Sequence, residues 1–228
     1  FMTSQSHLFY QGKFKQVFED IEKNQTLSMQ DTHNLAVARF LATGQSPLSL
    51  LENIVKQIRD ESPNESWPSH PSWNLVCYHI CLYYFTIGDY QECTTRLKDL
   101  WDNSGTADRL IVLVLSLLSI EFFIRTGNDS FLEKSLLFLQ QHFPTQDSIN
   151  SFLSSQIQDH SWIEKVTSTV LYASLRTDVS KASRMPIESA KQQFEGILNS
   201  INISPDTKNR TLQPVKKIIP IALSALFL

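Results

Sequence analysis

Apolar residues recur every three to four positions along most of the chain, and this spacing predicts α-helices rather than strands. The clearest helical segments are residues 73–86 and 91–101, which are separated by a short polar turn. Gly88 is expected to end the first helix in a left-handed conformation, because glycine has no side chain to oppose it. Asp89 is expected to cap the second helix, with Glu92 as its reciprocal partner. This part of the chain therefore predicts a helical hairpin.

The same arrangement recurs around three other glycines, Gly12, Gly44 and Gly127. The intervals between the four consecutive glycines are 32, 44 and 39 residues, and the longest contains a stretch rich in proline and serine at 61–72. That stretch is expected to form an irregular loop between helices. Four successive hairpins predict an all-α chain in which antiparallel helix pairs stack into a right-handed solenoid.

The sequence also predicts how the hairpins begin and how far the solenoid extends. Ser46 and Pro47 are expected as the cap and first residue of the helix after Gly44. Asn128 or Asp129 is expected to cap the helix after Gly127. One domain with about ten or eleven helices is expected over residues 1–228. The helices in 148–228 are expected to be less regular than those before them. The apolar ending is what a piece of a longer solenoid would show.

The hairpin around Gly88 resembles a tetratricopeptide repeat, whose period is about 34 residues. In such a repeat, small residues let the two helices approach closely, and aromatic residues fill the gap to the next hairpin. The resemblance assigns structural positions to Ile80, Cys81, Tyr84, Gly88, Tyr90, Cys93 and Leu97, and in the other hairpins to Gly12, Phe14, Gly44 and Gly127.

Charge and apolar run length argue against nucleic acid and membrane partners. The net charge is -3, and no run of lysine or arginine forms a basic stripe. The two most apolar runs, 110–120 and 218–228, are shorter than the roughly 18 residues that a membrane helix needs. The first 30 residues contain no continuous apolar segment typical of a secretory signal. The cytoplasm is the expected location, with the nucleus as a second one.

Candidate chemistry is sparse. Cys77 and Cys81 lie on one face of a predicted helix and Cys93 lies nearby, which raises the possibility of a zinc site. A fourth ligand is not apparent, and small buried cysteines at packing positions are the favoured interpretation. The histidines are scattered, and the six glycines form no phosphate-binding loop. We therefore expect no enzymatic activity, no metal and no cofactor.

The helix predicted at 73–86 is apolar on nearly its whole circumference, so it must be either enclosed or covered by a partner. One hypothesis places part of it on the concave face of the solenoid as a groove for a partner protein, and the alternative buries it beneath neighbouring repeats. The groove hypothesis assigns partner contact to Leu75, Tyr78, Leu82 and Phe85, with Asn34 as a polar addition.

The order of the hairpins over about residues 6–143 resembles the N-terminal repeats of subunit ten of the Ccr-Not deadenylase complex. The segments that carry the resemblance are NLAVARF, YYFTIGDY and LIVLVLSLLSIEFFI. The resemblance implies a non-enzymatic scaffold in a complex that shortens messenger-RNA poly(A) tails. It also implies two protein partners, subunit eleven and the large scaffold subunit one. The alternative is an adaptor that captures short protein tails with basic residues and asparagine on its concave face.

Overall fold

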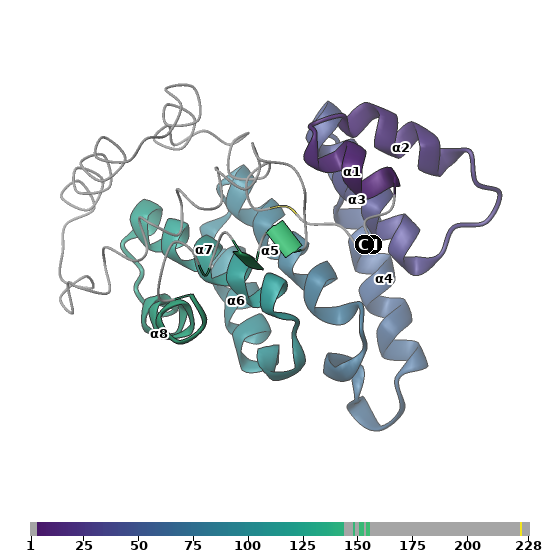
Figure 1. Cartoon of the computed structure of the whole chain (residues 1–228). Helices are drawn as coiled ribbons and strands as arrows, with labels where there is room; N and C mark the ends of the chain where they lie inside the picture. The colour runs from purple at the N-terminus through teal and green to yellow at the C-terminus, as the bar shows by residue number, and fades with distance from the viewer. Residues whose placement is uncertain (1–3, 144–147, 149–150, 153, 156–223, 225–228) are drawn as a thin grey trace. The chain divides into compact units, whose positions relative to one another are not determined.

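The computed structural model describes residues 4–143, 148, 151–152, 154–155 and 224 (Figure 1). Over these residues the chain contains eight α-helices and no strand, which confirms the all-α prediction. The helices predicted in 148–228 lie outside the described residues, apart from a few single positions. The α-helices are α1 (Ser4–Tyr10), α2 (Phe14–Glu22), α3 (Met29–Thr43), α4 (Leu48–Glu61), α5 (Trp73–Ile87), α6 (Tyr90–Asp102), α7 (Arg109–Thr126) and α8 (Leu132–His142).

The chain divides into two units between Ile111 and Val112, inside α7. The first unit contains α1 to α6 and the opening residues of α7, and the second contains the remainder of α7 and α8. The single domain that the sequence predicts stays a prediction.

The four predicted glycine turns are present. Gly12, Gly44, Gly88 and Gly127 all have φ between 73° and 83°. At Gly88 the left-handed conformation lets its N–H donate to the Phe85 carbonyl at 3.2 Å and the Asp89 N–H donate to Tyr84 at 3.0 Å. These two bonds occupy carbonyls that the end of α5 would otherwise leave unpaired.

The start of α6 follows the prediction only in part. Asp89 caps the helix as expected, because its carboxylate accepts from the Glu92 N–H at 3.2 Å. The prediction of a reciprocal bond between the Glu92 carboxylate and the Asp89 N–H is wrong. The Asp89 N–H donates to the Tyr84 carbonyl, and the Glu92 carboxylate accepts from Arg96. A complete capping box occurs at α3, between Ser28 and Asp31.

The beginnings of α4 and α8 also refine the predictions. The prediction for α4 is wrong by one residue, because Pro47 occupies the capping position and the helix begins at Leu48. The Ser46 hydroxyl nevertheless accepts a hydrogen bond from the Leu48 N–H at 3.3 Å. The prediction that Asn128 or Asp129 caps α8 is wrong, because Phe131 occupies the capping position and its side chain makes no capping hydrogen bond. Asn128 instead closes the turn by accepting from the Ser130 N–H at 3.0 Å.

Within the first unit, each helix packs against the helices that precede and follow it in the chain: α1 on α2, α2 on α3, α3 on α4, α4 on α5 and α5 on α6. Side chains from α3, α4 and α5 form one buried cluster in this stack. Removing a buried aliphatic side chain from such a core costs about 2–5 kcal/mol. The core cluster consists of Ala36, Leu51, Ile54, Val55, Ile58, Trp73, Val76 and Ile80.

In α7 almost every described side chain is buried. Its two buried serines satisfy their hydroxyls locally, since Ser116 and Ser119 each donate to the carbonyl one turn earlier at 2.8 Å. No helix in the described ranges has both the length and the apolar composition that a membrane span requires.

Candidate functional site

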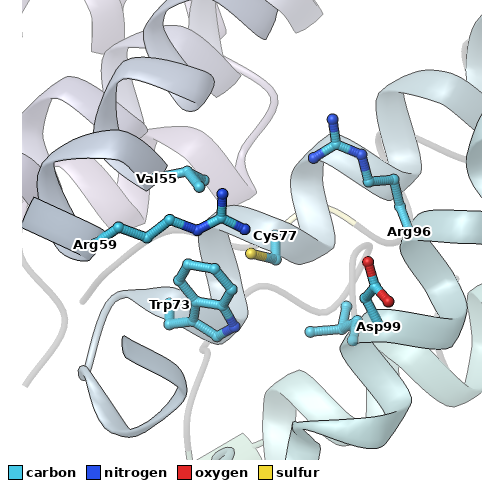
Figure 2. Close-up of a pocket in the computed structure, with 7 residues that line it drawn as sticks. Val55, Arg59, Trp73, Cys77, Arg96 and Asp99 are labelled. Atoms are coloured by element: carbon cyan, nitrogen blue, oxygen red, sulfur yellow. The ribbon is translucent and has the colours of Figure 1, made fainter. Parts of the chain in front are cut away.

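A small cleft lies where α4, α5 and α6 meet, and it holds a volume of about 40 Å³. Each helix contributes side chains spaced three or four residues apart, which helical periodicity places on one face. Figure 2 shows Arg59 and Trp73 on one side, Arg96 and Asp99 on the other, and the Cys77 thiol between them. The full lining is Val55 and Arg59 from α4, Trp73 and Cys77 from α5, and Arg96, Asp99 and Leu100 from α6.

The guanidinium of Arg59 is held by two tryptophans. It lies 5.7 Å from the ring centroid of Trp67 and 5.5 Å from that of Trp73. Trp67 comes from the 61–72 loop, which is irregular as predicted and forms two short 3-10 turns, Pro63–Glu65 and Trp67–Ser69. The loop does more than connect helices, because Trp67 is half-buried against the core and positions a charged group at the cleft.

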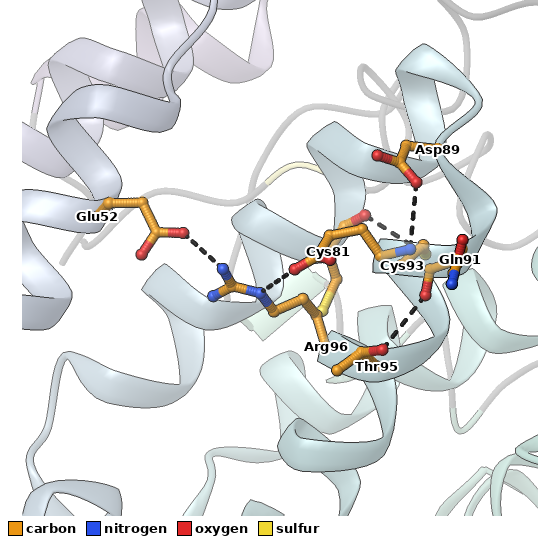
Figure 3. Close-up of polar contacts among 8 residues, drawn as sticks. Glu52, Cys81, Asp89, Gln91, Cys93, Thr95 and Arg96 are labelled. Carbon is orange, nitrogen blue, oxygen red and sulfur yellow. Dashed lines mark hydrogen bonds and ion pairs between the residues drawn. The ribbon is translucent and has the colours of Figure 1, made fainter.

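Arg96 is occupied by three partners. Its Nη2 donates to Glu52 on α4 at 2.8 Å, its Nε donates to Glu92 on its own helix at 3.1 Å, and its guanidinium lies 5.8 Å from the Tyr84 ring centroid. Figure 3 shows this side chain reaching from α6 to Glu52. These groups are about one-third exposed, so each pair contributes at most about 1 kcal/mol, but together they tie α6 to α4.

Burial raises the pKa of the Cys77 thiol to about 12, and the nearby Arg96 and Arg59 lower it only in part. The group therefore stays protonated at neutral pH, whereas a reactive cysteine needs a thiolate. Among the described residues, no three histidine, cysteine, aspartate or glutamate side chains cluster in a way that could hold a metal ion.

The groove predicted on α5 is wrong. Its four assigned residues, Leu75, Tyr78, Leu82 and Phe85, are at most 3% exposed and form part of the core. The sequence pattern showed correctly that α5 is apolar all round, and the structure encloses it. Such side chains cannot meet a partner without the core opening, which leaves no accessible groove at these positions.

The repeat positions assigned around Gly88 behave as packing residues. Ile80, Cys81, Cys93 and Leu97 are buried, while the aromatic positions Tyr84, Tyr90 and Phe14 are half-buried. The three cysteines are free, and the Cys93 thiol donates to the Cys81 carbonyl at 3.6 Å. This contact is the close approach of α5 and α6 that two small facing residues permit.

Asn34 is buried as well, so its predicted place on a partner surface is wrong. Its side-chain oxygen lies 2.9 Å from His33 Nδ1, and His33 Nε2 lies 3.0 Å from Nδ1 of His79 on α5. His79 Nδ1 also lies 3.1 Å from the Leu75 carbonyl. With Asn34 as acceptor, His33 carries its proton on Nδ1 and accepts from His79 through Nε2. The Nδ1–H of His79 then faces two acceptors, His33 Nε2 and the Leu75 carbonyl.

Both histidine pKa values agree with this arrangement. Burial lowers the pKa of His33 to about 4, although the hydrogen bond that His33 donates to the Asn34 side-chain oxygen opposes the shift. Burial, followed by the neighbouring His33, lowers the pKa of His79 well below its usual value. Sequence reasoning missed this pair because 46 residues separate the two histidines, and no local pattern connects them.

The described part of the chain thus defines an all-helical protein of consecutive hairpins, with a charged cleft and a buried histidine pair. Comparison with models of known families found no match, and neither curated proteins nor solved structures gave one.

Proposed function

We propose that this protein is a non-enzymatic assembly subunit whose helical hairpins form a tetratricopeptide-like solenoid and hold other proteins together. The observation that carries the proposal is the order of packing in the first unit, where each helix contacts its neighbours in the chain. Solenoids are built in this way, because each repeat buries its apolar face against the next one.

The left-handed glycines support the same proposal. Four helices are followed by a glycine with positive φ, and in the first unit these turns recur between helices that pack together. The inert thiol of Cys77 also fits a binding role better than a chemical one.

As the specific form of this function, we propose a scaffold role like that of subunit ten in the Ccr-Not complex, in the cytoplasm and the nucleus. Its support is the order and spacing of the hairpins in residues 6–143. The proposed partners are subunit eleven and the large scaffold subunit one, and the proposed process is shortening of messenger-RNA poly(A) tails.

The test is affinity purification of the tagged full chain from cells, followed by mass spectrometry. Recovery of deadenylase subunits supports the scaffold role, and co-expression with subunit eleven and with subunit one separately then identifies the direct contact. Recovery of chaperones or of proteins sharing a short tail, without deadenylase subunits, overturns the scaffold role in favour of an adaptor. The adaptor has weaker support, because Asn34 is buried and bonded to His33.

A further inference from the structure

One wall of the cleft between α4, α5 and α6 carries a positively charged side chain, Arg59, that is held in place by its neighbours. The Arg59 side chain is exposed, yet its guanidinium is held over two aromatic rings. In the described part of the chain no carboxylate lies within ion-pair distance of it. A guanidinium fixed in this way can bind a carboxylate with two parallel hydrogen bonds and loses little side-chain freedom in doing so.

The opposite wall of the cleft carries a negatively charged side chain, Asp99. Asp99 is exposed on α6, and the cations nearest to it in sequence are already engaged: Lys98 pairs with Asp102, and Arg96 pairs with Glu52 and Glu92. Within the described residues the Asp99 carboxylate has no ion-pair partner of its own. It can therefore accept from an incoming ammonium group or backbone N–H.

The floor between the two charges is apolar and small. It is formed by Val55, Trp73, Leu100 and the protonated Cys77 thiol. A volume of about 40 Å³ accepts the end of one aliphatic side chain. A drug-sized ligand or a cofactor needs a pocket of about 300–1,000 Å³. The two walls come from α4 and α6, so a ligand seated here would contact two successive hairpins.

We propose that this cleft binds a short extended segment of a partner protein that carries an acidic, an aliphatic and a basic residue in succession. The aliphatic side chain enters above Trp73, the acidic one pairs with Arg59, and the basic one reaches Asp99. This inference rests on the proposed assembly function and specifies one of its contact points. A polyanion fits less well, because the Asp99 carboxylate on the opposite wall of the cleft would repel it, and Arg96 is already paired with Glu52.

The test uses an array of nine-residue peptides with leucine at the centre and every combination of glutamate, glutamine and lysine on its two sides. Fluorescence polarisation measures their binding to the full chain. Peptides with glutamate on one side and lysine on the other should bind about tenfold more tightly than the glutamine pair, because each charged contact is a charge-assisted hydrogen bond. Equal binding across the array, or no binding at 1 mM, overturns the inference.

Charge-swapped variants make the assignment specific. Arg59→Glu should lose the preference for glutamate, and Arg59→Glu with Asp99→Lys should restore tight binding with the opposite peptide orientation. Lys56→Glu is the matched control, since it makes the same charge change on an exposed position of α4 that does not line the cleft. If Lys56→Glu weakens binding as much as Arg59→Glu, the effect is general electrostatics and the inference fails. Circular dichroism checks that each variant folds. If Arg59→Glu does not fold, Arg59→Gln is used in its place.

A final arm separates this inference from the proposed function. If Arg59→Glu recovers the same partner proteins as the unmodified chain, the cleft is not the contact point while the assembly function stands. If neither the unmodified chain nor Arg59→Glu recovers partner proteins, the proposed assembly function fails. The peptide array then still tests whether the cleft binds the proposed segment. A phosphoserine peptide that binds without any need for lysine would identify a phosphate site and overturn the inference.

Discussion

The buried histidine pair makes the fold sensitive to mild acid. His33 and His79 are both at most 4% exposed, and their ring nitrogens lie 3.0 Å apart. Protonating His33 on Nε2 would place two N–H groups against each other and bury a charge. Lowering the pH from 7.5 to 5 is the perturbation that exposes this cost.

The direction and size follow from the shifted pKa values. The pKa of His33 is lowered from 6.5 to about 4 in the folded chain, so the unfolded chain binds more protons between these values. Stability is complete above pH 6.5 and falls as the pH decreases through this window. For His33 alone the loss is about 2 kcal/mol at pH 5 and about 3 kcal/mol at pH 4. His79 acts in the same direction, because its pKa is lowered as well.

Urea unfolding followed by circular dichroism measures this loss at pH 7.5, 6.5, 5.5 and 5. His33→Gln keeps hydrogen-bonding capacity but does not titrate, so its decrease in stability over this range should be about 2 kcal/mol smaller than that of the unmodified chain. His7→Gln serves as the matched control, because His7 is exposed on α1 and should leave the decrease unchanged.

The result that refutes the reasoning is an equal loss of stability in the unmodified chain and in His33→Gln. Nuclear magnetic resonance supplies a second measurement that does not depend on the variant. The ring protons of His33 and His79 should not titrate between pH 8 and 5 in the folded chain. A midpoint near the usual value for either ring would show that the pair is not held neutral.

Three further substitutions test the packing. Tyr78→Ala should lower stability by about 3–5 kcal/mol in a thermal or chemical melt, because Tyr78 is fully buried, whereas the half-buried Tyr83 should lose less on the same change. Cys93→Phe should overpack the contact between α5 and α6 and cost about 1–3 kcal/mol; an unchanged melting temperature would contradict the close approach. Gly88→Ala should cost about 1–2 kcal/mol through its φ of 82° alone, since a Cβ there meets no other atom, and Gly105→Ala should be nearly neutral.

Local signals in the sequence predict local structure well. Gly44 and Gly88 end their helices in the left-handed conformation because this preference resides in the residue itself. The Asp89 cap also depends on residues only three positions apart. The Glu92 side chain behaves differently, because Arg96 competes for it with a stronger, charge-assisted bond. Once an alternative partner is available, a local motif no longer determines the outcome.

The candidate site depends on residues that are distant in the sequence. Arg59 is held in place only because Trp67 and Trp73, from a loop and from the next helix, lie beside its guanidinium. The apolar circumference of α5 predicts that the helix is covered but does not identify what covers it, since a core and a partner groove require the same residues. The sequence could not distinguish these two cases, and the groove hypothesis chose the wrong one. The burial of Tyr78 and its neighbours shows that the core covers α5.

Among the polar contacts between the hairpin α3–α4 and the hairpin α5–α6, two join the helices themselves: the buried pair His33–His79 and the partly exposed pair Glu52–Arg96. A third bond joins Gln30 on α3 to Ser72, which precedes α5. Apolar side chains tolerate several relative positions of two helices, whereas hydrogen bonds of 3.0 and 2.8 Å tolerate few. We infer that these links fix how the two hairpins are aligned. Substituting His79 should remove the buried link, and salt should weaken the exposed one.

Removing the buried link and weakening the exposed one should therefore act more than additively. Raising sodium chloride from 0.05 to 0.5 M at pH 7.5 should change the urea unfolding transition of the unmodified chain little, because the buried link persists. The same increase should lower both the midpoint and the slope of the transition of His79→Leu, since neither link then holds the hairpins in place. Combining Arg96→Met with His79→Leu removes both links in advance and should abolish the difference between the two salt concentrations. If salt has the same effect on the unmodified chain and on His79→Leu, the two links act independently and do not share the alignment of the hairpins.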